Sequence, residues 1–113
     1  MPNIGIVLSG GASKCIAHLG VIKALNEIGV KLNLISAVSG GALLGSIIAS
    51  GISPEETLKI IIDKADFSYY FPSFKSGGLF TMSRIRDIYE QTLPVKTFEE
   101  LSIPLVVNAT DVN

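Results

Sequence analysis

The sequence predicts an α/β fold in which a layered, mostly parallel sheet is flanked by helices. Three short apolar runs rich in β-branched residues, at about 4–8, 33–38 and 104–110, are separated by segments with helical periodicity. Strands that alternate with helices in this way form parallel sheets with right-handed crossovers. With 48% hydrophobic residues, the 113-residue chain can form a packed core, and we assign residues 1–113 to one domain.

The first strand and the first helix flank a glycine-rich turn. The run "IGIVL" at 4–8 is apolar throughout, which predicts a strand buried on both faces of the sheet. Residues 13–28 then show helical periodicity, and Gly29 is the expected C-cap. Four apolar residues share the helix face that should enter the core: Ile16, Leu19, Ile22 and Leu25.

The middle of the chain predicts two helices after the second strand. The segment "GGALLGSIIAS" at about 40–50 is apolar nearly all round, so its helix should lie inside the protein. Ser53, followed by Pro54 and two glutamates, is a typical N-cap, and the helix that it begins should run to about residue 65. Residues 66–80 are expected to form a loop.

The last third predicts a helix over about 83–93, then a helical turn and the third strand. Three strands are few for such a sheet, so we expect residues 1–113 to be the N-terminal part of a longer domain. The remainder of that domain, or an oligomer partner, would complete the sheet, and these 113 residues alone should be inactive. The alternative is a small complete domain whose open sheet edge is covered by oligomerisation.

Composition excludes several function classes. The net charge of −1 gives no electrostatic footprint for nucleic acid. One cysteine and one histidine provide no metal-ligand cluster, and no cofactor is expected. A single cysteine also permits no internal disulfide, and the sequence shows neither a signal peptide nor an apolar run of about 18 residues, so we expect a cytoplasmic protein.

The first glycine-rich turn is "LSGGASKC", residues 8–15. Gly10 and Gly11 allow a tight turn with outward N–H groups, and Lys14 adds a positive charge. The turn lacks the glycine spacing of a Rossmann loop and does not fit a P-loop. It could supply the backbone donors of an oxyanion hole, bind a phosphate, or be a plain turn between strand and helix.

The second glycine-rich turn is "AVSGG", residues 37–41. A nucleophile elbow needs small residues two positions before and two positions after its serine, because strand and helix pass close there. Gly41 satisfies the second position, whereas Ala37 adds a methyl group at the first. Ser39 is therefore either a nucleophile at a sharp strand-to-helix turn or an ordinary cap of the following helix. Since both turns follow parallel strands, they should face one crevice, which would bring a nucleophile and oxyanion donors together for acyl transfer.

Three segments carry a resemblance to the N-terminal half of patatin-like phospholipases. They are "GIVLSGGASKCIAHLGVIKALNEIGV", "ISAVSGGALLGSIIASG" and "IPLVVNATDVN", in the family's order and spacing. The resemblance implies a patatin-like fold and hydrolysis of lipid esters, as in phospholipase A or lysophospholipase reactions. It also implies a Ser-Asp dyad without a catalytic histidine. The family's aspartate lies in a D-G-[GA] motif, which would follow residue 113, because Asp111 belongs to the A-T-D stretch instead.

The resemblance also assigns roles by position. Ser39 corresponds to the nucleophile, and Lys14 to the basic residue of the first turn. The oxyanion hole would be formed by the backbone N–H groups of Gly10, Gly11 and Ala12, together with that of Gly40 after the nucleophile. Ala12, Cys15 and Ala37 stand where the family has glycine, so a non-catalytic patatin-like domain is the alternative. A phosphate- or nucleotide-binding α/β module that uses residues 9–15 is a further one.

Three other features remain open. His18 is expected to be structural or to cap a backbone group near the site, and Cys15 to be a small buried residue, although a thiol of lowered pKa is the alternative. The segment 67–80 contains six of the eight aromatic residues. It could line an acyl pocket, make transient contact with a membrane surface, or pack on the remainder of the domain.

Overall fold

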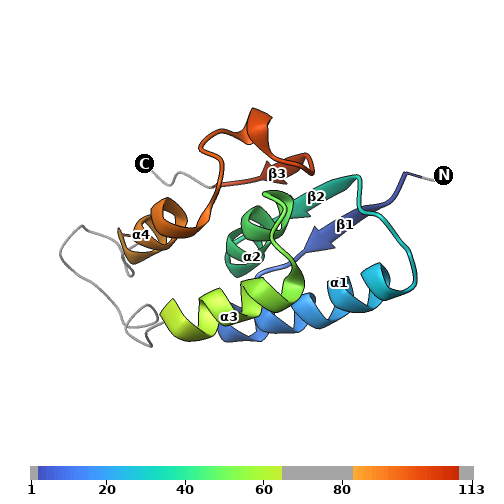
Figure 1. Ribbon diagram of the computed structural model, residues 1–113, viewed down its shortest axis with the longest axis horizontal. Coiled ribbons are helices and arrows are strands. Elements are labelled where there is room, and N and C mark those ends of the chain that lie inside the picture. The colour runs from blue at the N-terminus through green and yellow to red at the C-terminus, as the bar shows by residue number, and fades with distance from the viewer. Residues whose placement is uncertain (1–2, 65–82, 110–113) are drawn as a thin grey trace.

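The computed structural model describes residues 3–64 and 83–109, and it confirms the predicted α/β class. Strands β1 (Gly5–Leu8), β2 (Leu34–Ala37) and β3 (Leu105–Val107) form a parallel sheet in the order β1-β2-β3 (Figure 1). The register pairs Ile6 with Ile35 and Ile35 with Leu105, so the apolar residues of all three strands align on one face.

Within the described residues, four α-helices and two short 3₁₀ helices connect and follow these strands. In chain order they are η1 (Ala12–Ile16), α1 (Ala17–Glu27), α2 (Gly40–Ala49), α3 (Pro54–Lys64), α4 (Ser83–Thr92) and η3 (Phe98–Glu100). Figure 1 shows α1 and α3 side by side, and α2 packed on β2. The helix boundaries lie within about two residues of the predicted ones, except at the start of the first helix.

The predicted helix caps form as expected. Helix α1 ends in a left-handed Gly29 (φ 83°), and the Val30 N–H donates to the Leu25 carbonyl at 2.9 Å, which satisfies an otherwise free carbonyl. At the start of α3, the Ser53 hydroxyl accepts a hydrogen bond from the Glu56 N–H at 3.1 Å. Both caps lie near the amino ends of the strands.

The apolar core lies between the sheet and helices α1 and α2. Its buried residues are Leu8, Cys15, Leu19, Ile22, Ile35, Ala37, Leu44, Ile48 and Ala49. Most of α2 is buried, including Ile47 at 0% exposure, which confirms that this nearly all-apolar helix lies inside the protein. The core therefore fixes α2, and with it the turn that precedes it.

The first helix starts differently from the prediction. Residues 12–16 form a 3₁₀ turn, in which the Lys14 N–H donates to the Gly11 carbonyl at 2.9 Å, and the α-helix begins at Ala17. Because a 3₁₀ helix turns by about 120° per residue and an α-helix by about 100°, the predicted apolar face does not extend through residue 16. Leu19 and Ile22 are buried as expected, whereas Ile16 is 38% exposed.

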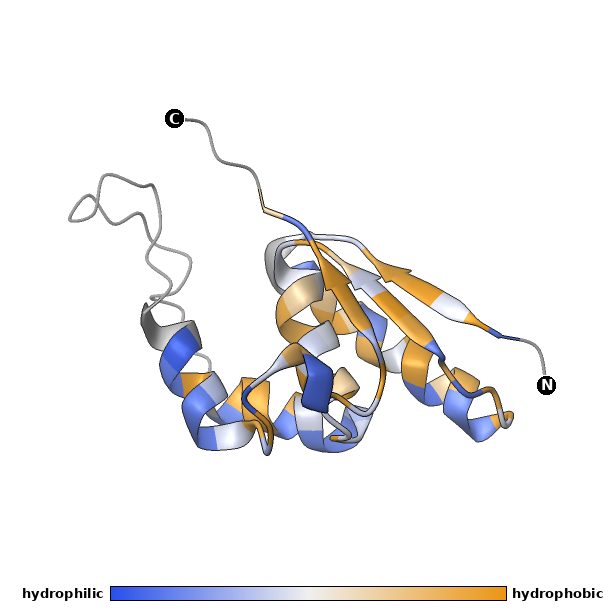
Figure 2. Cartoon of the chain, turned by 90° about the horizontal axis from the view of Figure 1, so that it is seen from above, coloured by the Kyte–Doolittle hydropathy of each residue, from blue (hydrophilic) through white to orange (hydrophobic). Residues whose placement is uncertain are grey.

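The prediction that strand 4–8 is buried on both faces is wrong for the described part of the chain. Val7 in β1 is 77% exposed and Val106 in β3 is 55% exposed, and both lie on the face opposite the core. Figure 2 shows the helices gathered on one side of the sheet. An apolar strand is compatible with two-sided burial, but the burial itself depends on elements that cover the second face.

Several expectations lie outside the described residues. These are the loop at 66–80, the aromatic segment at 67–80 and Asp111. Within the described segments, none of the helices has the length and apolar character needed to cross a lipid bilayer.

Candidate active site

The two glycine-rich turns lie against each other at the carboxyl ends of β1 and β2. We call residues 9–11 the glycine loop and residues 38–41 the serine turn. The Val38 N–H donates to the Leu8 carbonyl at 3.1 Å, so the two turns leave the sheet at the same level. A methyl group built on Gly10 would lie 2.9 Å from Ser39 Cβ and 3.4 Å from Ser39 Oγ. Gly10 and Ser39 are therefore in direct contact, and only a glycine leaves room for it.

Ser39 has a strained backbone. Its φ of 56° and ψ of −128° make it the one non-glycine residue with positive φ among those described. An ordinary N-cap residue has an extended backbone and a side-chain oxygen bonded to the helix, but Ser39 makes no such side-chain bond to α2. The geometry thus rules out the reading of Ser39 as a side-chain helix cap. A strained strand-to-helix turn that exposes a serine is the shape of a nucleophile elbow.

The small residues around Ser39 have a clear steric role. A methyl group on Gly41 would lie 2.3 Å from the Leu8 carbonyl oxygen and 2.7 Å from that of Ser9, so helix α2 begins directly on the end of β1. Ala37 is buried and fits, because a glycine, Gly45, stands opposite it. A methyl group on Gly45 would be 3.3 Å from Ala37 Cβ.

Sequence reasoning overlooked Gly45. The signal was the spacing Gly41-x-x-x-Gly45, which places two glycines one helical turn apart on the same face of α2. This face packs on Leu8, Ile35 and Ala37. The extra methyl of Ala37, at a position where the resemblance implies glycine, is therefore accommodated without displacing the helix.

The glycine loop and the serine turn present free backbone donors. Gly11 has φ 151°, a conformation that favours glycine, and it carries the chain from β1 into η1. In the described segments, no acceptor takes the N–H groups of Gly10, Gly11 or Gly40. Gly40 begins α2, so its N–H also lies at the positive end of the helix dipole. Ala12, the fourth predicted donor, is the first residue of η1.

Lys14, Cys15 and His18 line the helix side of the glycine loop. Lys14 is exposed, and no ion pair involves it in the described part of the chain. Cys15 is buried as expected, and burial raises the pKa of its thiol, so the alternative of a lowered pKa is wrong. His18 Nε2 lies 2.8 Å from the Ser9 carbonyl oxygen, which confirms that it caps a backbone group near the site.

The described residues show no hydrogen-bonded partner for the Ser39 hydroxyl. No carboxylate or imidazole in residues 3–64 or 83–109 is hydrogen-bonded to Ser39 Oγ, and the His18 Nε2 atom contacts the Ser9 carbonyl oxygen instead. Within the same segments, no three His, Cys, Asp or Glu side chains gather in a way that could hold a metal ion.

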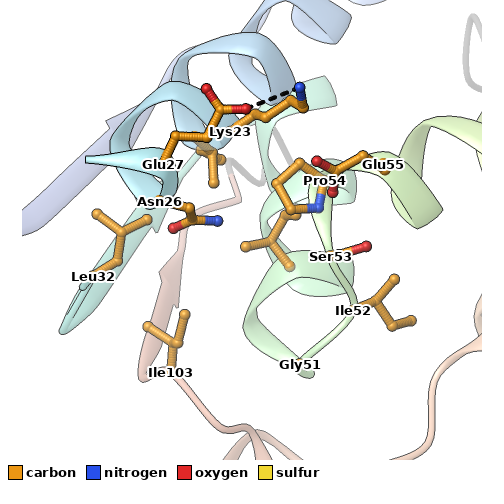
Figure 3. Close-up of a pocket in the computed structure, with 12 residues that line it drawn as sticks. Lys23, Asn26, Glu27, Leu32, Gly51, Ile52, Ser53, Pro54, Glu55 and Ile103 are labelled. Atoms are coloured by element: carbon orange, nitrogen blue, oxygen red, sulfur yellow. Dashed lines mark ion pairs between the residues drawn. The ribbon is translucent and has the colours of Figure 1, made fainter. Parts of the chain in front are cut away.

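A cavity of about 390 Å³ lies far from Ser39, at the other end of α2 (Figure 3). Ile22, Leu32 and Ile103 contribute apolar lining, while Asn26 and the Lys23–Glu27 ion pair (3.0 Å) lie at its polar side. In open α/β sheets, ligands bind at the carboxyl ends of the strands, whereas this cavity is at their amino ends. The serine turn, rather than this cavity, is therefore the candidate site.

Comparison with known proteins identifies the family of the chain. The family model described as patatin-like phospholipase matches residues 6–112. The chain is 30% identical to neuropathy target esterase sws of Drosophila grimshawi, with 97% of this chain and 8% of that protein aligned. It is also 30% identical to an uncharacterised NTE family protein of Mycobacterium bovis, with 97% of this chain and 31% of that protein aligned. The chain thus spans less than a third of the length of these relatives. It belongs to the patatin-like phospholipase family.

Proposed function

We propose that this protein is a serine acyl hydrolase that cleaves lipid esters, with Ser39 as the nucleophile. The observation that carries the proposal is the contact between Gly10 and the strained Ser39, since it joins free backbone donors to an exposed hydroxyl. Acyl transfer requires this pair: an attacking oxygen and donors for the oxyanion that forms. The names of the relatives, an esterase among them, support an ester substrate.

The proposed reaction has two steps. Ser39 Oγ attacks the ester carbonyl carbon, its proton passes to a base, and the carbonyl oxygen becomes an oxyanion. The N–H groups of Gly10, Gly11, Ala12 and Gly40 hold that oxyanion. The alcohol then leaves with a proton, and an acyl-serine remains. Water attacks the acyl-serine in the same way, which releases the fatty acid and restores the Ser39 hydroxyl.

The base is proposed to be an aspartate beyond residue 113, as the family resemblance implies. A Ser-Asp dyad agrees with the position of His18, whose Nε2 faces Ser9 rather than Ser39. We further propose that the protein is cytoplasmic and touches membrane surfaces transiently through residues 67–80, where lipid substrates reside. Lys14 would attract a negatively charged head group to the glycine loop.

A substitution of the nucleophile tests the proposal. In the full-length protein, Ser39→Ala should lower turnover of an acyl p-nitrophenyl ester by about 10⁴-fold or more, because loss of a nucleophile leaves only residual catalysis. Ser36→Ala, on the preceding strand, is the matched control and should retain turnover. Wild-type turnover by Ser39→Ala would refute the assignment. Ligand binding that depends on Lys14 and ignores Ser39 would instead identify a phosphate-binding module.

A further inference from the structure

The carbonyl of Ser9 is held by side chains from the first helix. His18 Nε2 lies 2.8 Å from the Ser9 oxygen, and Cys15 Sγ lies 3.8 Å from the same atom. A carbonyl oxygen can only accept a hydrogen bond, so the His18 Nε2 atom must carry the proton. Of the two contacts the imidazole bond is the shorter and, since thiols are weak donors, the stronger.

This bond determines the orientation of the next N–H group. The described chain has no cis peptide bonds, and in a trans peptide the C=O of one residue and the N–H of the next point in opposite directions. When the Ser9 carbonyl points toward His18, the Gly10 N–H must point away from α1. In the described segments nothing accepts that N–H, although Gly10 itself is in contact with Ser39.

The serine turn limits the position of the same carbonyl from another side. The Ser9 oxygen would lie 2.7 Å from a methyl group on Gly41, so it lies close against the start of α2. Such a contact restrains the carbonyl without bonding to it. Only the His18 imidazole donates a strong hydrogen bond to this oxygen among the described residues.

We propose that His18 is a positioning residue of the hydrolase: its Nε2–H fixes the Ser9–Gly10 peptide plane and so aims the Gly10 N–H at the oxyanion. This inference rests on the proposed function. It gives the single histidine a part in catalysis without placing it in a catalytic triad. A donor held in advance stabilises the transition state more than the bound ester, because the negative charge on the oxygen develops only then.

Three substitutions at position 18 separate positioning from bulk packing. In Gln the Nε2 atom is as many bonds from Cβ as in His, so His18→Gln can still donate to Ser9. In His18→Asn the amide is one bond shorter and should not reach, while His18→Leu removes the donor. Val21→Ala, at an exposed position of the same helix, is the control for general effects on α1.

The assay uses the full-length protein with an acyl p-nitrophenyl ester, and an acyl trifluoromethyl ketone as a mimic of the tetrahedral intermediate. We expect His18→Leu and His18→Asn to lower kcat about 10- to 100-fold, since complete loss of one oxyanion donor costs about 10²–10³-fold. KM should change less than about twofold, and ketone affinity should fall in parallel with kcat. His18→Gln should recover most of both.

The outcomes distinguish the two proposals. Unchanged kcat in folded His18→Leu, or equal loss in His18→Gln and His18→Asn, would overturn the role of His18 while Ser39-dependent turnover still stands. If wild-type turnover does not depend on Ser39, the proposed function fails and this inference fails with it. If His18→Leu does not fold, the comparison of His18→Gln with His18→Asn decides.

Discussion

The backbone polar groups at the amino end of the parallel sheet differ in their hydrogen bonding from those at the carboxyl end. At the amino end, Asn33 accepts from the Ile4 N–H through its side chain (2.9 Å) and donates its own N–H to the Ile4 carbonyl (2.7 Å). At the carboxyl end, the N–H groups of Gly10 and Gly40 have no acceptor within the described segments, and Ser39 is strained. The amino end pairs its backbone groups, whereas the carboxyl end has free donors, which under the proposed function would serve a substrate.

A substitution at Gly41 tests the close packing of helix α2 on the end of β1. Gly41→Ala would place a methyl group 2.3 Å from a backbone oxygen, so α2 must shift, and we expect the free energy of unfolding to fall by about 3 kcal/mol. Gly45→Ala meets side chains at 3.2–3.3 Å and should cost about 1 kcal/mol. Chemical denaturation of the full-length protein measures both.

Gly20→Ala is the matched control for these two variants. A methyl group on this helical glycine meets nothing within 4 Å, so the substitution should stabilise the protein by about 0.5–1 kcal/mol. Equal effects at Gly20 and Gly41 would show that α2 does not press on the end of β1.

The strain at Ser39 can be separated from its proposed chemistry by two variants that both lack the hydroxyl. Glycine adopts positive φ freely and alanine does not, so Ser39→Gly should be more stable than Ser39→Ala by about 1–2 kcal/mol. Thermal and chemical unfolding of the two inactive variants give the difference directly. If Ser39→Ala is the more stable of the two, the turn is not strained.

The amino end should respond more weakly, because its bonds are exposed and water can replace them. We expect Asn33→Ala and Ser53→Ala each to lower the free energy of unfolding by about 1 kcal/mol, with no change in kcat. Unfolding curves and ester turnover, measured on the same preparations, provide the test. A loss of kcat in either variant would contradict the view that the amino end of the sheet contributes to stability and not to turnover.

The smallest effect concerns Cys15, the buried thiol at the carboxyl end. Burial raises the pKa of this thiol above its ordinary value of 9.0, so the folded protein favours the protonated form. Stability from this group is therefore complete below pH 9.0 and falls as the pH rises above that value. Free energies of unfolding measured from pH 8 to 10 should decline less steeply in Cys15→Ala than in the wild-type protein. Identical slopes in the two proteins would argue against a raised pKa of the thiol.

The local parts of this structure follow from the sequence. Apolar periodicity predicts the strands and helices, and the small residues flanking Ser39 predict a sharp turn, because local sterics decide both. The 3₁₀ start of the first helix and the exposed Val7 do not follow, and for His18 the sequence predicts a backbone cap near the site but not that Ser9 is its partner. They depend on the exact backbone path of the turn at residues 9–16 or on what covers a sheet face. The apolar periodicity of the sequence does not contain this information.

The strained serine also offers a way to tell active from inactive members of the family. Positive φ at position 39 opposes folding, and under the proposed function the reaction is what favours a serine there. In family members that have lost this activity, glycine could replace serine at position 39. Gly41 would persist in the same lineages, because its neighbour is the backbone of β1 whether or not catalysis continues. Position 39 would thus report on selection for chemistry, and position 41 on selection for the fold.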